Sequence, residues 1–399
     1  MVQYGLPDEK RTCLLQPAIQ YERLDPSRVG KDMTSRKKCV MLANAGHKPL
    51  DTRIFHKESR WLQAAGWDVF LIIPHHEDFK KDNVQILAVP LPRKGWEQLV
   101  KCPWKIFLKA FRQPNDSIFH LHDSELLLVG IVLKLLGRTV IYDAHEDTPL
   151  QISYQHWIPG LLKKPYAWFY FVLEKLAGWW FDAVIVAEPV IAKYFPANKV
   201  TLLRNFPIAG SFQQEKNYLA RQNQLVYVGL LSKARGVVEM LEAHRKVSER
   251  TNLDFVLGGK FAPASLEHEL LTEFKVHYKS WLPYEEMIKA LYDARIGIII
   301  PHPIERYKTN YPVKLFEYMA AGLPVIASRE GESADFVREA SAGILVDPLN
   351  VEEIAQAIIS LLNDQSMAAD MGKRGRQLIF EKYNWEKESE KLLQLYQTL

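Results

Sequence analysis

Short apolar segments alternate with amphipathic segments along most of this chain. The run Cys39–Ala43 has the length and apolar character of a buried strand, and so does Asp68–Ile73. Between them, Arg53–Ala65 repeats its apolar residues with the helical period and stops at Gly66. Short apolar strands that alternate with helices are typical of a parallel sheet covered on both faces. Further strands are predicted at Val84–Val89, Ser117–Leu121, Thr139–Tyr142 and Ala183–Ala187, and helices at Leu126–Leu136 and Ala167–Leu176.

The same alternation begins again after the polar stretch Gly210–Asn223. We therefore predict an α/β protein with two Rossmann-like domains, at 37–207 and 208–380, followed by a last helix within 381–399 and preceded by a polar tail or arm at 1–36. A ligand is expected in the cleft at the carboxyl ends of the strands. The strands predicted in the second domain are Leu225–Val228, Asp254–Leu257, Ile296–Ile300, Pro324–Ser328 and Gly343–Val346, and the helices are Val237–His244, Pro312–Ala321 and Val351–Leu362.

The composition narrows the class of protein. A chain of 399 residues that is 48% hydrophobic and 25% charged is globular, and its length fits two domains. The net charge of +4 is too small to make nucleic acid the expected partner. Three cysteines are too few for a disulfide framework, which favours a reducing compartment. Since no apolar run reaches the roughly 18 residues of a membrane span, we expect a soluble, cytoplasmic protein without a signal peptide.

The segment Tyr311–Ser328 carries the most chemical information. Pro312 suits the first position of a helix, and Gly322 suits the position just after its end. Free N–H groups at the helix N-terminus suit a phosphate group. Lys314 is disfavoured in that first turn unless an anion binds there, or unless Glu317, three residues on, offsets its charge.

The run Pro312–Gly322 resembles a P-x-K-x-F-E-Y-M-A-x-G pattern in the GT-B-fold, family 4 retaining glycosyltransferases (glycosyl transferases group 1), specifically the bacterial polysaccharide-biosynthesis branch. The resemblance implies a nucleotide-sugar donor whose ribose hydroxyls are bound by Glu317, the second glutamate of the family's Glu–seven residues–Glu motif. Thr309 stands at the position of the first glutamate, and Asn310 beside it offers an uncharged contact to a sugar hydroxyl. The family also implies that the helix Trp385–Tyr396 crosses back to the first domain.

Further donor contacts follow from the same resemblance. The run Tyr227–Gly236 resembles the strand–glycine–loop of the family's donor domain, with Arg235 at the position of a diphosphate-binding lysine and Leu230 at that of an arginine. Lys233 is a candidate for the second charge, or a solvated lysine. The expected donor-binding residues are Gly229, Lys233, Arg235, Gly259, Lys260, Trp281, Thr309, Asn310, Tyr311, Pro312, Val313, Lys314 and Glu317.

The first domain is expected to supply the reacting face. His145 follows a predicted strand, where the family has a histidine close to the donor sugar, and His122 ends the preceding strand with His120. These two, His145 and His122, are the expected catalytic residues. We expect no metal site, because the spacing of these residues is not distinctive and GT-B enzymes generally need no metal. The expected acceptor-binding residues are Gly46, His47, Asp51, Arg53, Glu146 and Asp147.

Two of these assignments have an equally good structural alternative. Asp51 precedes a predicted helix and suits its N-cap, and Arg53 suits a surface side chain as well as an acceptor phosphate.

Two segments of the first domain are typical of a membrane-interface surface. Lys101–Arg112 places four basic residues on one stripe of a helix beside an aromatic and aliphatic stripe, with no acidic residue. Tyr166–Phe181 contains eight aromatic residues, of which we expect half to lie in the core. These segments predict a lipid-linked acceptor or membrane-bound partner, and a peripheral location at the inner face of the plasma membrane.

Together, these observations predict a retaining glycosyltransferase that moves a sugar from a nucleotide-sugar donor to a glycan or lipid-linked saccharide, in cell-surface polysaccharide biosynthesis. The nucleotide-sugar is a co-substrate, and no other cofactor is expected. Two alternatives stay open: a nucleotide-sugar epimerase, which needs carboxylates placed to handle a sugar C–H proton, and a catalytically silent nucleotide-sugar-binding subunit of a glycan assembly complex.

Overall fold

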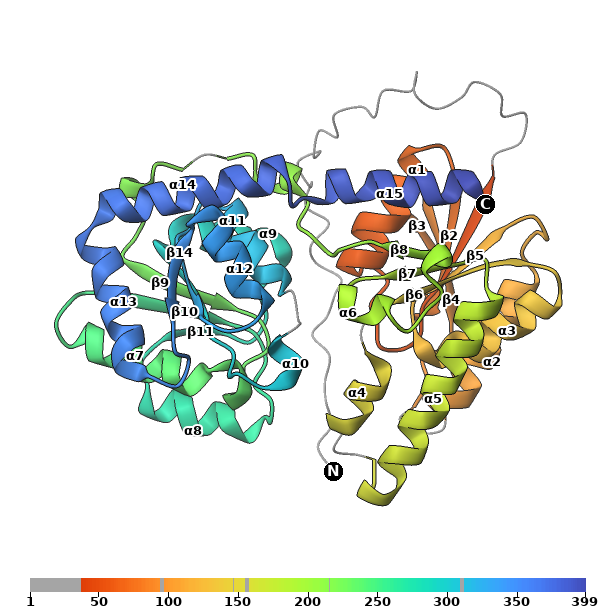
Figure 1. Ribbon diagram of the computed structural model, residues 1–399, viewed down its shortest axis with the longest axis horizontal. Helices are drawn as coiled ribbons and strands as arrows, with labels where there is room; N and C mark the ends of the chain where they lie inside the picture. Colours follow the sequence, from red (N-terminus) through yellow and green to blue (C-terminus); the bar gives the residue numbers. More distant parts are fainter. Residues whose placement is uncertain (1–36, 94–96, 146, 155–157, 215, 309–311) are drawn as a thin grey trace.

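The computed structural model describes residues 37–399 except 94–96, 146, 155–157, 215 and 309–311, so the predicted tail at 1–36 lies outside the described residues. The chain forms two α/β domains side by side, each around its own sheet (Figure 1). The first sheet has eight strands in the order β3-β4-β2-β1-β5-β6-β7-β8, and the second has six in the order β11-β10-β9-β12-β13-β14. Every neighbouring pair is parallel except β3 and β4.

The first domain places helices on both faces of its sheet, as two separate apolar clusters show. Its strands are β1 (Lys38–Leu42), β2 (Asp68–Pro74), β3 (Phe79–Lys81), β4 (Val84–Val89), β5 (Ile118–Leu121), β6 (Thr139–Ala144), β7 (Ala183–Val186) and β8 (Val200–Leu202). Its helical segments are η2 (Thr52–Ser59), α1 (Arg60–Ala64), η3 (Glu97–Lys101), α2 (Cys102–Phe111), η4 (Ser124–Leu126), α3 (Leu127–Leu135), α4 (Thr148–Tyr154), α5 (Gly160–Trp180), α6 (Pro189–Ala192) and η5 (Ala197–Lys199).

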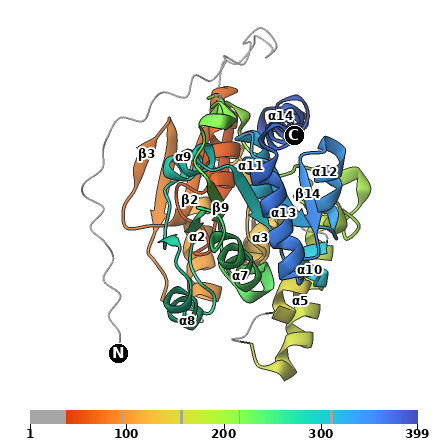
Figure 2. The same cartoon turned by 90° about the vertical axis from the view of Figure 1, so that its left-hand side faces the viewer.

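The second domain repeats this architecture, and Figure 2 shows α7 and α8 on one side of its sheet with α9 and α11 on the other. Its strands are β9 (Gln224–Val228), β10 (Asp254–Gly258), β11 (His277–Lys279), β12 (Ile296–Ile299), β13 (Val325–Ser328) and β14 (Gly343–Val346). Its helical segments are η6 (Ala209–Phe212), η7 (Tyr218–Ala220), η8 (Lys233–Arg235), α7 (Val237–Ser248), α8 (Ser265–Glu273), α9 (Tyr284–Asp293), α10 (Glu305–Lys308), α11 (Val313–Ala320), α12 (Glu332–Ala340), α13 (Val351–Asn363) and α14 (Gln365–Glu381).

The helix α15 (Trp385–Thr398) returns from the second domain and packs on the first (Figure 1), which confirms the predicted crossing. Trp385, Leu392 and Tyr396 are fully buried in the apolar cluster that covers one face of the first sheet. The Tyr396 hydroxyl lies 2.9 Å from His120 Nδ1 on β5 and 3.1 Å from the Cys39 thiol on β1. The far end of the sequence therefore completes the core of the first domain.

The differences from the predicted elements are local. The three-residue strands β3, β8 and β11 at sheet edges were not predicted, because such short edge segments carry no continuous apolar run. Helix α5 extends well beyond the predicted Ala167–Leu176 and continues through Pro165. Pro312 caps α11 from just outside, with extended backbone, instead of occupying its first turn. Within the described chain, no helix combines the length and apolar character that crossing a membrane requires.

Candidate functional site

A small pocket opens at the N-terminus of α11, where the carboxyl ends of β9 and β12 converge. Pro312 and Lys314 bring the start of that helix to the pocket, and Arg235 reaches it from the loop after β9. The described residues that line it are Tyr227, Arg235, Ile299, Pro301, Tyr307, Pro312, Lys314 and Ser333. These lining residues include two cations, Arg235 and Lys314, and no carboxylate, so the pocket is suited to an anion.

Lys314 is held in the pocket by Tyr227 and Gly229. Its Nζ donates to the Tyr227 hydroxyl at 3.0 Å and lies 4.4 Å from the centre of that ring. Gly229 has a φ of +148°, which favours glycine, and it lies so close to Lys314 that a side chain there would displace the ammonium group. Burial lowers the pKa of Lys314, and the nearby Arg235 guanidinium lowers it further. An anion bound in the pocket would stabilise the charged form of Lys314 and raise its pKa again.

Arg235 belongs to the short helix η8, which ends at Gly236 with a φ of +78°. A side chain at Gly236 would collide with the carbonyl oxygen of Ile300, so the loop can pack against β12 only with glycine here. The Arg235 guanidinium lies 5.7 Å from the centre of the Tyr307 ring, and its Nε is buried with no hydrogen-bond partner among the described residues. The guanidinium lines the pocket without a carboxylate among the described lining residues, so its charge is available to a phosphate group.

Glu317 lies one turn after Lys314 on α11 and is only 8% exposed. Burial raises its pKa, while the charges of Lys57 and Lys314 act in the opposite direction. Lys57 comes from η2 of the first domain, where its Nζ donates to the Asn205 carbonyl at 3.2 Å. Glu317 is thus placed at the boundary between the domains, next to the pocket but not among the residues that line it.

Of the other predicted donor residues, Gly259 and Trp281 make close contacts, whereas Lys233 and Lys260 are exposed to solvent. Gly259, at a φ of +133°, packs so closely on the backbone of Gly229 that a side chain there would collide. Trp281 is 62% exposed and lies under Lys48 Nζ, 4.4 Å from the ring centre, so it contacts the first domain. Lys233 and Lys260 are exposed and absent from the pocket lining, so the prediction that they bind the diphosphate does not fit this arrangement.

Two further predicted donor residues lie at the start of α11. Pro312 lines the pocket and Val313 is the first residue of the helix. Thr309, Asn310 and Tyr311 lie outside the described residues, as does Glu146 of the acceptor set.

In the first domain, His145 follows β6 and is oriented by Asp143. The distance from His145 Nε2 to Asp143 Oδ2 is 3.0 Å, and the histidine side chain stays 20% exposed. Asp143 also accepts two hydrogen bonds from Arg53, at 2.9 and 3.0 Å. Burial alone would raise the pKa of Asp143, but the charge of Arg53 holds it well below its usual value. The carboxylate is therefore a fixed anchor for the His145 ring.

Two predicted residues of this region take other roles. Arg53 is 4% exposed and pairs with Asp143 and Glu58, so its predicted acceptor contact and its surface alternative are both wrong. The His122 side chain is fully buried behind His145, 3.4 Å from it, so the prediction that it is catalytic is also corrected. Both residues contact Asp143, which in turn positions the His145 ring.

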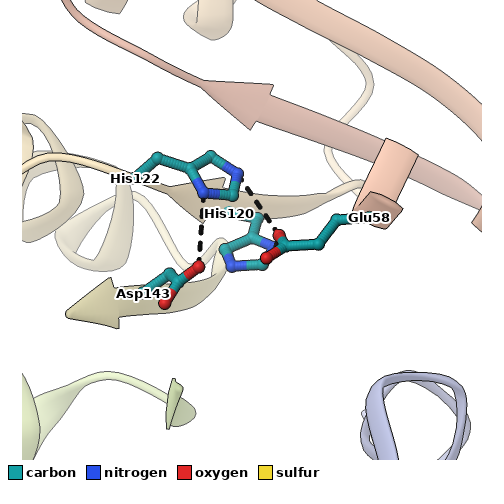
Figure 3. A group of neighbouring side chains, drawn as sticks. All are labelled: Glu58, His120, His122 and Asp143. Carbon is teal, nitrogen blue, oxygen red and sulfur yellow. Dashed lines mark ion pairs between the residues drawn. The ribbon is translucent and has the colours of Figure 1, made fainter. Parts of the chain in front are cut away.

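Glu58, His120, His122 and Asp143 form a buried cluster that has the donor types of a metal site (Figure 3). Arg53 Nε lies 3.0 Å from a Glu58 oxygen and 2.9 Å from an Asp143 oxygen, so this guanidinium already supplies a positive charge between the carboxylates. Burial raises the pKa of Glu58 well above its usual value and lowers that of His120. These features fit an ion-paired core with neutral histidines better than an ion-binding cage.

The predicted acceptor loop is organised around His47. Its ring nitrogens lie 3.2 Å from Asp123 and 3.5 Å from Asp51, and its ring centre lies 5.8 Å from that of His145. Asp51 is the N-cap of η2, as the sequence suggested, and accepts from the backbone N–H of Arg53 and Ile54. Asp147 accepts from Leu150 N–H and from the Tyr194 hydroxyl. Gly46 lies beside Asp123, and His47 lies next to His145.

Replacing His47 by asparagine is expected to change how stability depends on pH. Burial alone would lower the pKa of His47, but Asp123 and Asp51 overcome it and raise this pKa to about 10. Its stabilising charge is therefore fully present below about pH 6.5 and is lost as the pH rises towards 10. We expect the melting temperature of His47→Asn to be about 5 °C below that of the natural chain at pH 6, with the gap closing by pH 10.

Thermal melts of both proteins at pH 6, 8 and 10 measure this gap. The exposed His268→Asn variant serves as the control, for which no gap is expected at any of these pH values. A gap for His47→Asn that stays constant with pH would contradict the pairing.

Sequence reasoning missed Asp143, Glu58, Lys57 and Tyr307 as parts of the site. Lys57 and Glu58 stand in an amphipathic helical segment where charged residues normally face water. No local pattern distinguishes a charge buried by a partner on a distant strand. Tyr227 did carry a signal, because it directly precedes Val228 and Gly229 in the glycine motif.

Comparisons with known proteins cover both domains. Residues 211–378 match the model of the family described as Glycosyl transferases group 1, and residues 52–205 match the Glycosyl transferase 4-like domain. An uncharacterized glycosyltransferase of Methanocaldococcus jannaschii is 24% identical over 216 residues, which cover 50% of this chain and 54% of that protein. The chain thus spans about half the length of this curated relative.

Two solved structures match most of the chain. Sucrose-phosphate synthase from Thermosynechococcus elongatus has a TM-score of 0.70 at 20% identity, with 91% of this chain and 99% of that chain covered. The Anabaena protein HepE in complex with UDP and glucose has a TM-score of 0.68 at 14% identity, with 91% and 100% covered. At these identities the likeness concerns the fold, and it confirms the predicted arrangement of two facing α/β domains.

Proposed function

The chain belongs to the glycosyl transferases of group 1, and from this premise we propose that it transfers a sugar from a nucleoside diphosphate sugar to a saccharide or lipid-linked saccharide, with retention of the anomeric configuration. The observation that carries the proposal is the pocket at α11, where Lys314 and Arg235 stand together with no carboxylate among the described lining residues. Two adjacent cations match the two charges of a diphosphate leaving group.

The proposed reaction separates binding from bond cleavage. Glu317 accepts hydrogen bonds from the ribose hydroxyls, while Lys314, Arg235 and the free N–H groups of α11 stabilise the diphosphate as its charge develops. His145, oriented by Asp143, lies at the reacting face beside the anomeric carbon. The bond between the anomeric carbon and the diphosphate oxygen breaks, and the acceptor hydroxyl attacks from the face that the diphosphate has left, passing its proton to the departing diphosphate, so that the configuration is retained. Closure of the two domains excludes water from the reaction.

Support for a nucleoside diphosphate donor comes from the fold. The similar Anabaena structure contains UDP and glucose. Among the described residues of this chain, the pocket lies at a helix N-terminus beside the carboxyl ends of parallel strands, which is where such folds bind phosphates. We propose that the pathway is cell-surface polysaccharide biosynthesis, and that the protein works peripherally at the inner face of the plasma membrane through Lys101–Arg112 and Tyr166–Phe181.

A panel of nucleotide-sugars tests the proposed donor. A donor at about 100 times its dissociation constant stabilises a protein by about 2.7 kcal/mol, so one of the UDP-, GDP- or dTDP-sugars is expected to raise the melting temperature by several degrees. A CMP-sugar, with one phosphate, is the matched comparison and is expected to give a smaller shift. The Glu317→Gln variant is expected to need about tenfold more donor for the same shift.

The panel also has a result that contradicts the proposal. If no nucleoside diphosphate sugar shifts the melting temperature, the pocket does not bind the proposed donor. If one binds, a transfer assay with His145→Ala addresses the chemistry: transfer by the natural chain and its loss in the variant support the enzyme. Binding without any transfer supports the silent subunit, and a changed sugar released without acceptor supports the epimerase.

A further inference from the structure

One face of the first domain exposes most of the large apolar side chains that the described chain leaves in water. Sixteen of the twenty-four such side chains lie on three helices and the turns that flank them. They are Val100, Trp104, Leu108 and Phe111 at α2, Leu128, Val132, Leu135 and Leu136 at α3, and Leu161, Leu162, Trp168, Phe169, Phe171, Leu176, Trp179 and Trp180 at α5. Soluble monomers rarely expose so large an apolar surface unless something covers it.

These three helices form a continuous surface, here named the α2–α3–α5 face. Helix α3 packs against both α2 and α5, and Figure 1 shows the three helices next to one another in the first domain. The N-terminal half of α5 carries Leu161 at 93% exposure and Trp168 at 67%, and it projects beyond the sheet. This projecting half of α5 exposes apolar side chains where they can insert among lipid headgroups.

Most charges on this face are basic, although Glu97 beside Val100 pairs with Lys101, and Asp182 after α5 pairs with Lys134. Helices α2, α3 and α5 contain a single carboxylate, Glu174, which is 4% exposed and accepts hydrogen bonds from Tyr142 and Thr148. Lys105, Lys164 and Lys175 are exposed on the same helices, and Arg112 follows α2. Basic residues next to exposed tryptophan and leucine are the combination that binds an anionic lipid surface.

We propose that the α2–α3–α5 face docks on the surface of an anionic lipid bilayer, with its tryptophan and leucine side chains among the headgroups and its lysine and arginine side chains on lipid phosphates. This inference rests on the proposed function, because it assigns the surface on which a lipid-linked acceptor is met. The face belongs to the first domain alone, so docking leaves the donor-binding domain free to move. The acceptor loop around His47 then stays fixed relative to the membrane.

Flotation of the full-length protein with vesicles tests this docking. Binding to vesicles of phosphatidylglycerol and phosphatidylcholine is expected to be at least about tenfold tighter than binding to phosphatidylcholine alone. The double variant Trp168→Gln/Trp179→Gln removes two exposed apolar groups and is expected to weaken binding about tenfold or more. The variant Lys105→Glu/Lys164→Glu is expected to abolish the preference for anionic vesicles. Leu219→Gln, an exposed change in the second domain, is the matched control and is expected to bind as the natural chain does.

Two results would overturn the docking. One is a natural chain that does not float with anionic vesicles, and the other is face variants that float as well as it does. A natural chain that is an oligomer and becomes monomeric in the face variants, without vesicle binding, would assign the face to a second copy of this chain. Thermal shift with the donor on the same samples separates the two proposals: a donor shift without flotation contradicts docking alone, whereas flotation without a donor shift contradicts the proposed function alone.

Discussion

Replacing Lys314 by alanine is expected to lower kcat by about 100- to 1000-fold, the usual cost of removing one group that stabilises developing charge in a preorganised site. Its ammonium group stands in the α11 pocket, fixed by the Tyr227 hydroxyl at 3.0 Å. Because α11 keeps its cap and its apolar face, the variant is expected to stay folded. Steady-state kinetics with the donor identified by the panel measure the loss.

Lys233→Ala is the matched control for this experiment. Lys233 stands in the same glycine loop as Arg235, but its side chain is 65% exposed and lies 3.8 Å from Glu269. We expect less than about a threefold change in kcat, since exposed ion pairs contribute little. If both lysine variants lose activity equally, or if Lys314→Ala retains it, the anion is bound elsewhere.

Replacing Arg53 by methionine is expected to destabilise the first domain by about 3–5 kcal/mol, because it leaves the buried Asp143 carboxylate without its counter-charge and the buried Glu58 carboxyl group without its partner. Arg53 makes its ion pairs at 2.9 and 3.0 Å in a region with almost no exposure. His145 also loses its anchor, since Asp143 is no longer held on both oxygens. Urea unfolding followed by tryptophan fluorescence measures the change in free energy.

Two variants make the Arg53 result specific. Arg245→Met removes an exposed pair with Glu273 and is expected to change stability by less than about 0.5 kcal/mol. Adding Asp143→Asn to Arg53→Met removes one orphaned charge and is expected to recover part of the loss. An Arg53→Met protein as stable as the natural chain would mean that the cluster is not an ion-paired core.

Most of the fold follows from local patterns. Nearly continuous apolar strands such as Cys39–Leu42 and Ile296–Ile299 are buried on both faces of a sheet, so their composition alone predicts them. The glycine just after α11 adopts a positive φ of +70°, as its place in the sequence predicted. Lys314 and Glu317 were singled out through the resemblance of Pro312–Gly322 to the family pattern, and both lie on α11, one turn apart.

What the sequence could not decide is which charges are buried. In the sequence, Arg53, Lys233 and Lys260 are all basic residues in similar local patterns. Only contacts with distant segments determine which of them is buried and which is solvated. The aromatic run of α5 presents the same difficulty. Tyr170 and Phe181 are buried, whereas Trp168, Trp179 and Trp180 point outward, because α4 and the core of the first domain cover one stripe of that helix.

The return of α15 to the first domain has a consequence for synthesis. Trp385, Leu392 and Tyr396 fill one side of a core whose other members begin at Cys39. During translation the amino-terminal lobe therefore leaves the ribosome with an open apolar flank, which stays uncovered until the whole nucleotide-binding lobe has been made. Folding of the two domains is thus coupled during translation. The first domain is synthesised first, but its core is complete only after α15 has been made.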